Sequence, residues 1–188
     1  MIDLEHAHGV AVIRMHENRC GALDPSTLDR VAAALRYVGD AYAVVLTGWE
    51  DVFSRGWAGG DPELLERAVL AVSRHPMPVV AAIGGDALGA GYALAAAADA
   101  RVMSSEGQLG LAGAAALTPD VEAVLRRHAG AAWRAVSVGE RIFGADSARA
   151  AGLVNVCCAP GEVVRVAVER AALLAGSAGE KLVSVHDG

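Results

Sequence analysis

The chain is poor in aromatic residues and in cysteine, and each shortage narrows what it can be. Of its 188 residues only two are Phe, three Tyr and three Trp, although 54% of the chain is hydrophobic. We therefore expect a core built mainly from Leu, Val and Ala. This length suits one compact domain with a sizeable core and is short for two domains.

Basic charge is also in short supply. The formal net charge is −6 and the sequence pI is about 5.5. No basic field is therefore available to hold a phosphate backbone, and we expect no nucleic acid among the partners.

The three cysteines, Cys20, Cys157 and Cys158, have no C-x-x-C spacing. An odd number of cysteines without that spacing predicts neither a disulfide framework nor a zinc site. We therefore expect a reduced, cytoplasmic setting.

The first residues offer neither an export signal nor a metal site. Residues 1–19 carry acids and histidines where a signal peptide would have basic residues and then an apolar stretch. Three of these residues, His6, His8 and His16, lack a matched set of further ligands nearby, so surface positions on a hairpin are the better interpretation. We expect no bound metal.

A long apolar run without charge is missing as well. Residues 79–100 are long enough to raise the question of a membrane span, but Asp86 lies inside them and most of their apolar residues are Ala and Gly. A charge at that depth is costly, so we expect no membrane-spanning segment.

Strand and helix signals alternate along what remains. Strands are predicted at 2–5, 10–15, 43–47, 79–83, 100–103 and 153–157. Helices are predicted to begin at Asp24, Asp61, Ala87 and Thr118, with further helices at 131–138, 146–151 and 160–175. The alternation predicts an α/β domain over residues 1–175 with right-handed crossovers. For the tail, residues 176–188, a strand, a helix start and disorder all remain open.

Two glycine-rich corners, residues 54–60 and 84–91, each follow a predicted strand. In α/β sheets ligands collect at the carboxyl ends of strands, so the two corners are expected to form one site. Their glycines would let a ligand approach backbone N–H groups at the start of a helix. The alternative is that small residues only allow tight packing of helix on sheet, and the local sequence does not choose between the two.

The best-known glycine motifs do not fit these corners. Gly89-Ala90-Gly91 opens like a dinucleotide fingerprint, but Leu94 stands where a small residue is needed. A P-loop lysine and a G-x-S-x-G nucleophile motif are also missing from the sequence. The remaining hypothesis is an acyl-thioester site in which one backbone N–H from each corner stabilises a developing oxyanion.

Four stretches of the sequence carry a resemblance to a known family. They are Asn18 with Gly21-Ala22-Leu23, then 44–56 (VVLTGWEDVFSRG), 76–102 (PMPVVAAIGGDALGAGYALAAAADARV) and 139–157 (GERIFGADSARAAGLVNVC). In this order they resemble the enoyl-CoA hydratase/isomerase, or crotonase, superfamily over nearly the whole chain. The resemblance implies a single-domain ββα spiral, a homotrimer or hexamer, and binding of an acyl-CoA or related thioester. Coenzyme A would enter as part of the substrate, with no separate cofactor.

The resemblance also implies site residues. Arg55 takes the first oxyanion-donor position and Ala90 the second, both acting through the main-chain N–H. Their neighbours are expected to contact the substrate; these are Gly56, Trp57, Gly89 and Gly91.

Both glutamates of the family's hydratases are missing, because Ala93 and Gly113 occupy their positions. Hydration needs a carboxylate to activate water, so ordinary hydratase activity is not expected. Asp120 and Glu122 open a helix that borders the active site in relatives and are the candidate replacements. Acids in the first turn are also what any helix favours, which is the competing explanation.

Two shortened regions bear on the ligand and on the rest of the fold. In relatives the segment that corresponds to 56–78 is longer and helps to hold the CoA adenine. Because it is short here, CoA is a less certain ligand than an acyl thioester in general or a carrier-bound acyl group. The C-terminal helical region that usually covers the pocket is largely missing after Ala175. We therefore expect a biosynthetic isomerisation, cyclisation or decarboxylation; the alternative is a catalytically silent acyl-ligand-binding or scaffolding protein.

Overall fold

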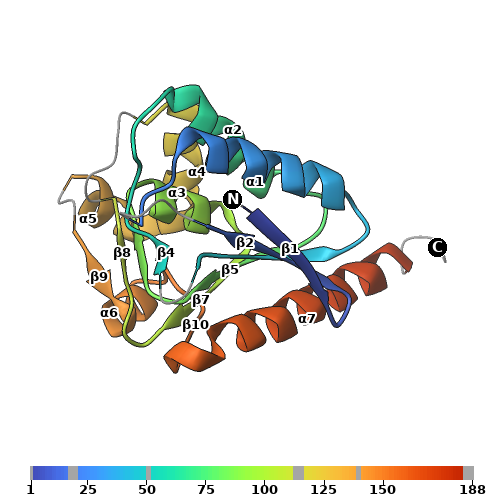
Figure 1. Ribbon diagram of the computed structural model, residues 1–188. Helices are drawn as coiled ribbons and strands as arrows, with labels where there is room; N and C mark the ends of the chain where they lie inside the picture. The colour runs from blue at the N-terminus through green and yellow to red at the C-terminus, as the bar shows by residue number, and fades with distance from the viewer. Residues whose placement is uncertain (1, 17–20, 50–51, 112–116, 139–140, 184–188) are drawn as a thin grey trace.

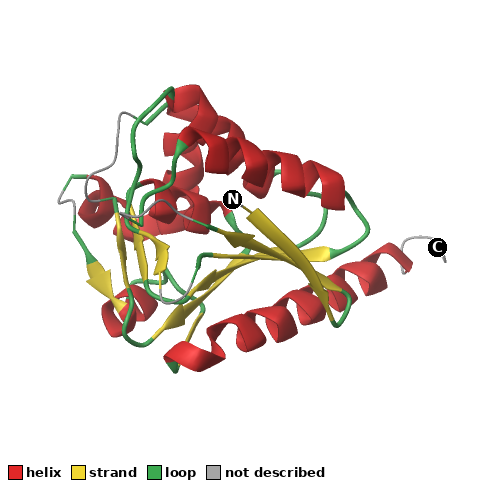
Figure 2. Ribbon diagram, viewed as in Figure 1, coloured by secondary structure: helices red, strands yellow, loops and turns green. Residues whose placement is uncertain are grey.

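A six-stranded sheet with helices on both faces forms the body of the protein (Figures 1 and 2). The computed structural model describes residues 2–16, 21–49, 52–111, 117–138 and 141–183. The strand order is β1-β2-β3-β5-β7-β10, with β1 antiparallel to β2 and all other neighbours parallel. The strands are β1 (Ile2–Ala7), β2 (Val10–Met15), β3 (Ala43–Thr47), β5 (Val79–Ile83), β7 (Ala100–Ser104) and β10 (Val156–Cys158).

Apolar residues on both sides of the central strands supply two cores. Successive side chains of a strand point to opposite faces of the sheet, so an unbroken apolar run contributes side chains to the cores on both faces. In β5, for example, Val79 and Ala81 face one core while Val80 and Ala82 face the other. The first core lies under the helices at 25–38, 62–73, 90–97 and 119–129, and the second lies under the helix at 163–183.

A second, smaller sheet stands beside the first and comprises β4 (Val52–Ser54), β6 (Asp86–Leu88), β8 (Gln108–Gly110) and β9 (Phe143–Gly144). Each of β4, β6 and β8 follows directly on a strand of the large sheet, and each is followed along the chain by a helix. This strand–strand–helix repeat is the ββα spiral that the resemblance implies. It confirms the predicted α/β fold class and the single domain.

Three helices begin where the sequence predicts, but the helix expected from Ala87 begins at Ala90, because residues 86–88 form β6. Side chains of Asp24, Asp61 and Thr118 accept hydrogen bonds from backbone N–H groups in the first turns of α1, α2 and α4. The helices are α1 (Pro25–Val38), α2 (Pro62–Ser73), α3 (Ala90–Ala97), α4 (Pro119–Ala129), α5 (Trp133–Ser137), α6 (Ala145–Ala150) and α7 (Val163–Val183). Short 3₁₀ segments at Gly130–Ala132 and Pro160–Glu162 precede α5 and α7.

Three details differ from the sequence expectations. The last strand is β10 at Val156–Cys158 rather than 153–157, although Leu153 and Val154 are buried. Strands β4, β6, β8 and β9 were not expected, because strands of two or three residues leave no readable period. Finally, α7 runs unbroken past residue 175 to Val183, since Gly176 lowers helix propensity without ending the helix.

No helix in the described part of the chain is both long enough and apolar enough to span a membrane.

Candidate functional site

The small sheet brings the two glycine-rich corners side by side. Strand β4 leads into the first corner and β6 into the second, and they pair in parallel with Ser54 opposite Ala87. Helix α3 then starts directly over β4. A Cβ on Gly91 would lie 2.7 Å from the Ser54 Cβ and 2.8 Å from the Ser54 carbonyl oxygen, so only glycine permits this approach.

The second predicted donor, the Ala90 N–H, has no acceptor in the part of the chain that the structure describes. Gly89, with φ 54°, turns the chain out of β6; its N–H donates to the Gly110 carbonyl at 2.9 Å and its carbonyl accepts from the Ala93 N–H at 3.1 Å. Ala90 is the first residue of α3, so its N–H has no partner within the helix. No other acceptor among the described residues takes it.

The first predicted donor is already engaged. The Arg55 N–H donates to the Gly21 carbonyl at 2.7 Å. This bond belongs to a short parallel pairing between residues 21–23 and the first corner, in which the Leu23 N–H donates to Gly56 and the Ala58 N–H donates to Leu23. In this structure Arg55 therefore has no backbone N–H to offer a ligand.

The pairing leaves the backbone N–H of Trp57 without an acceptor. Trp57 lies opposite Leu23, whose N–H and carbonyl bond to Gly56 and Ala58, so the N–H of Trp57 points away from residues 21–23. In the described ranges it meets no acceptor. The N–H groups of Trp57 and Ala90 are thus among those at the corners that have no acceptor in the described part of the chain, one following β4 and one following β6.

The Trp57 side chain packs at the edge of the larger core. Its ring lies 3.7 Å from where a Cβ on Gly60 would stand, and its indole Nε1 is buried without a hydrogen-bond partner. A buried indole N–H usually finds an acceptor, so this one is an open donor beside the corner.

The helix after the second corner carries no acid. All eight residues of α3 are buried, and Ala93 is one of them. Gly113, the other position expected to have lost a glutamate, lies outside the described residues.

The structure directs the candidate replacement acids elsewhere. The Asp120 carboxylate, with 60% of its side chain exposed, lies 4.0 Å from the Arg74 guanidinium just beyond α2, and Glu122, 44% exposed, pairs with Arg126 at 2.6 Å. Ser73 of α2 and Ala96–Ala98 line the same pit, so this end of α2 lies beside the C-terminal end of α3. At 1.5 Å per residue that end is about 10 Å from Ala90.

One ion pair does join the two corners. The Arg55 Nε lies 3.7 Å from the Asp86 carboxylate across β4 and β6, with side chains 58% and 32% exposed. Asp86 was not among the residues expected at the site, because nothing in the sequence shows which residues of two short strands face each other.

Behind α3 lies a buried polar cluster that sequence reasoning also missed. The Tyr92 hydroxyl and the His128 Nε2 are buried without partners, and their rings are 6.1 Å apart. Burial raises the pKa of Tyr92; burial first and then the nearby Arg101 charge lower the pKa of His128 to about 3. The Arg101 guanidinium itself donates to the carbonyls of Leu153 and Ala98.

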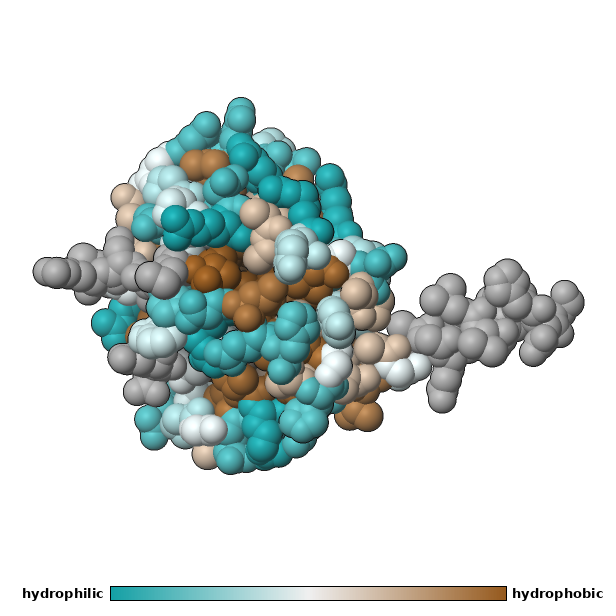
Figure 3. Space-filling model, turned by 45° about the vertical axis from the view of Figure 1, so that its right-hand side comes forward, coloured by the Kyte–Doolittle hydropathy of each residue, from teal (hydrophilic) through white to brown (hydrophobic). Residues whose placement is uncertain are grey.

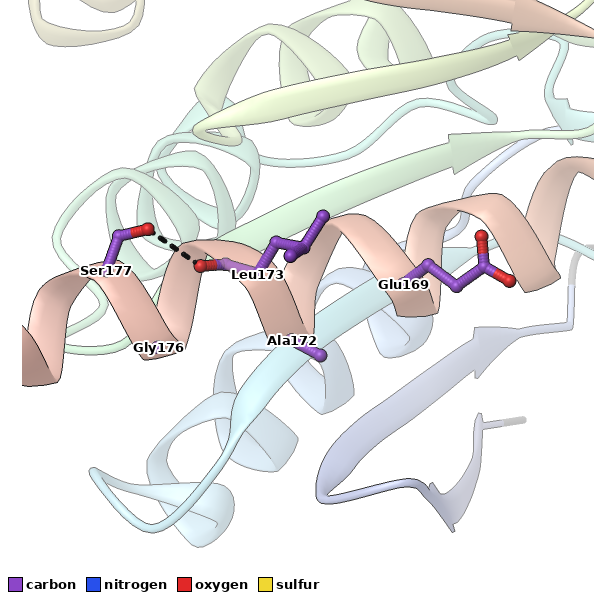
Figure 4. Close-up of a pocket in the computed structure, with 5 residues that line it drawn as sticks. All are labelled: Glu169, Ala172, Leu173, Gly176 and Ser177. Carbon is purple, nitrogen blue, oxygen red and sulfur yellow. Dashed lines mark hydrogen bonds between the residues drawn. The ribbon is translucent and has the colours of Figure 1, made fainter.

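A separate groove lies on the opposite side of the large sheet. It has a volume of about 700 Å³ and follows the outer face of α7, where Glu169, Ala172, Leu173, Gly176 and Ser177 line it (Figure 4). Helix α7 belongs to the second core, whereas α3 and Ala90 belong to the first. This groove is therefore separate from the corners.

Metal ligands do not gather anywhere in the portion of the chain that is described: no three His, Cys, Asp or Glu residues form a group that could hold an ion. The hairpin histidines instead contact aromatic rings, His6 with Tyr42 and His16 with Trp49.

The sequence is similar to known proteins over most of its length. A sequence model described as Enoyl-CoA hydratase/isomerase matches residues 5–187. The probable enoyl-CoA hydratase echA17 of Mycobacterium avium is 35% identical over 177 residues, which cover 82% of this chain and 68% of that relative.

Solved structures agree with the fold. An enoyl-CoA hydratase/carnithine racemase from Magnetospirillum magneticum superposes with a TM-score of 0.82 at 24% identity, over 100% of this chain and 81% of that one. A monofunctional enoyl CoA isomerase from M. smegmatis gives a TM-score of 0.80 at 24% identity, over 100% and 94%. At these identities the two structures establish the architecture alone.

Proposed function

Because the chain belongs to the enoyl-CoA hydratase/isomerase family, we propose that it binds an acyl thioester with the carbonyl oxygen between the N–H groups of Trp57 and Ala90. The observation that carries the proposal is that these two N–H groups lack acceptors among the described residues and follow two paired strands of the small sheet, β4 and β6. Trp57 replaces Arg55 as the first donor, since the Arg55 N–H is taken by Gly21.

Two such donors favour reactions that pass through an enolate. Negative charge that develops on the thioester oxygen is stabilised by preorganised N–H groups more than the neutral ground state is. The N-terminal end of α3 adds its dipole to the same point. Coenzyme A enters this proposal as part of the substrate, and a carrier-bound acyl group satisfies the same chemistry.

The missing acids narrow the choice of reaction. Ala93 supplies no carboxylate, and Asp120 and Glu122 are paired with arginines away from Ala90. Of isomerisation, cyclisation and decarboxylation, the last needs no protein base. The bond between the α-carbon and the carboxyl carbon breaks, and CO₂ leaves. The electron pair of that bond stays with the substrate as an enolate, whose negative charge lies on the thioester oxygen. Water then protonates the α-carbon.

The test removes the backbone N–H of Ala90 while keeping helix α3 intact. Ala90 is the first residue of α3, where proline is tolerated but has no N–H. With malonyl-CoA as substrate and acetyl-CoA measured by chromatography, Ala90→Pro should lower kcat by about 100-fold, the usual effect of removing one oxyanion donor. Ala90→Ser keeps the N–H and is the matched control.

Binding separates this proposal from the silent alternative, which the methyl group of Ala93 favours. A bound acyl-CoA at about 100 times its dissociation constant should stabilise the protein by about 2.7 kcal/mol in thermal unfolding. Stabilisation that depends on the Ala90 N–H without any turnover would identify a ligand-binding or scaffolding protein. The absence of a shift with every thioester would contradict both.

We also propose a homotrimer or hexamer. Several large apolar side chains are exposed, Val138 and Leu173 among them, and hydrophobic surface runs between hydrophilic areas on the face drawn in Figure 3. Such surface supports contacts between subunits.

A further inference from the structure

Two grooves border the outer face of α7 and share lining residues. The groove of Figure 4 has a volume of about 700 Å³, and a second, of about 510 Å³, lies between α7 and the hairpin turn at Ala7. Glu169 and Ala172 line both. Between Val164 and Ser177, the first and last α7 residues that line them, the grooves follow the helix for about 20 Å. This length suits an elongated occupant such as another helix.

Leu173 forms a ridge on this face beside small residues. Its side chain is 67% exposed. Ala172 precedes it, and Gly176 follows about one turn later, with no atom within 4 Å of the place where a Cβ on Gly176 would stand. A ridge next to open, small positions allows the axes of two packed helices to approach to about 8–10 Å.

Charges on the same face are largely balanced within the helix. The Arg165 guanidinium pairs with Glu162 and, at 2.6 Å, with Glu169. One cation and two anions leave this cluster close to neutral on a chain whose net charge is −6. A strongly charged partner of either sign would find little complement here, whereas a second copy of the chain would meet little repulsion.

The face is complementary to itself when two copies of α7 run antiparallel. A register that sets Ala172 opposite Leu173 of the second copy places each large side chain against a small one. The same register places Glu169 opposite Gly176, and the two Glu169 side chains start about 10 Å apart along the helices. Parallel helices would instead set Leu173 against Leu173 and Glu169 against Glu169.

We propose that two copies of the chain pair through α7, antiparallel, around a two-fold axis between Ala172 and Leu173. Each copy then offers the same patch to the other. This goes beyond the assembly proposed above, because a two-fold contact joins trimers in pairs and so gives the hexamer. It does not depend on the thioester site, which lies on the other side of the large sheet. In unfolding measurements at protein concentrations low enough to separate the copies, this face is exposed.

An introduced cysteine near the axis tests the pairing. A disulfide needs two Cα atoms within about 7 Å, which the proposed axis provides for residue 172. Under mild oxidation at micromolar protein, Ala172→Cys should form a covalent dimer about 100-fold faster than Tyr37→Cys, since pairing raises the effective thiol concentration to the millimolar range. Tyr37, on α1 and 82% exposed, is the matched control. The unaltered protein, which has three cysteines, gives the background rate.

Two further variants test the register. Glu169→Cys and Gly176→Cys should each cross-link slowly alone, because each cysteine lies about 10 Å along the helices from the same residue of the second copy. An equimolar mixture of the two variants should cross-link as readily as Ala172→Cys. Adding Leu173→Glu to Ala172→Cys should return cross-linking to background, since it removes the apolar ridge. Thermal unfolding close to that of the unaltered protein, as expected at exposed positions, shows that these variants are folded.

The outcomes separate this pairing from the proposals before it. Cross-linking of Ala172→Cys no faster than that of Tyr37→Cys overturns the pairing and leaves both the thioester site and a trimer in place. Rapid cross-linking of Glu169→Cys with itself indicates parallel helices and overturns the antiparallel register. Sedimentation of the unaltered protein as a trimer overturns the two-fold contact alone, whereas a hexamer together with the cross-linking pattern supports it.

Discussion

At the scale of single residues, the corner depends on small side chains that the sequence makes easy to find. Gly91 lies against Ser54 and Gly89 has a positive φ, so both glycines are needed by the backbone path itself. Their spacing after an apolar strand is what predicted a site here, and the resemblance added Ala90, whose N–H stands at the start of α3.

The choice between Arg55 and Trp57 could not be made in the same way. Which N–H groups of an extended segment are free depends on the partner strand, because alternate residues face opposite sides. The partner here is residues 21–23, more than 30 positions away, and nothing in the local sequence gives the register. The paired Arg55 and the free Trp57 were therefore indistinguishable before the fold was known.

His128 gives a prediction about pH. Its pKa is near 6.5 in the unfolded chain and about 3 in the folded one, where burial first and then the Arg101 charge disfavour the charged ring. Above pH 6.5 the ring is neutral in both states and has no effect. As the pH falls from 6.5 towards 3 only the unfolded chain takes up the proton, so stability should fall by about 1.4 kcal/mol per pH unit.

Urea unfolding at several pH values measures this slope. His128→Leu should flatten the decline below pH 6.5, whereas His8→Gln at the exposed tip of the hairpin should leave it unchanged. An equally steep decline in His128→Leu would show that other groups cause it.

At the scale of elements, α3 and α7 show two ways in which a helix meets the sheet. Helix α3 is buried all round and consists mostly of Ala, since it must fit between α2, α4 and the small sheet. Helix α7 buries one side only, with Ala167 and Ala171 against the strands and Ala172 outside. The sequence predicted both helices, but the length of α7 was underestimated because Gly176 resembles a terminator.

Packing under α7 should be intolerant of added volume. Ala167 has no exposed surface, and a larger side chain there must push the helix away from the sheet. Ala167→Leu is expected to lower the free energy of unfolding by about 1–3 kcal/mol, as overpacking usually does.

Ala172→Leu makes the same change on the exposed side of the same helix and should cost less than about 0.5 kcal/mol. Chemical denaturation of the pair gives the comparison. Equal effects would mean that helix propensity, and not contact with the sheet, sets the cost.

At the scale of the whole molecule, the family and the architecture were predictable because the motifs extend over nearly the full chain. The fate of the candidate acids was not. Asp120 and Glu122 follow a helix-capping Thr118, and the structure shows them as the first-turn acids of an ordinary helix, paired with Arg74 and Arg126.

The assembly is the prediction at this scale. We expect sedimentation equilibrium to give three or six times the chain mass of 19.2 kDa. Replacing the exposed Leu173 by Glu should shift the distribution towards monomer if the outer face of α7 lies in an interface. Tyr37→Glu, at another highly exposed apolar position, shows whether any effect is particular to α7; a monomer for the unaltered chain would contradict the expected assembly.

The alternation of the central strands between two cores limits how the chain can change in length. A single residue inserted into β5 would move Val79 and Ala81 to the side of α7 and bring Val80 and Ala82 under α3 and its neighbours. Since β3, β5 and β7 are buried on both faces, the exchanged side chains could not be placed in solvent on either face. Insertions and deletions are therefore confined to the connections between strands and helices, and those connections include the two corners that hold the candidate site.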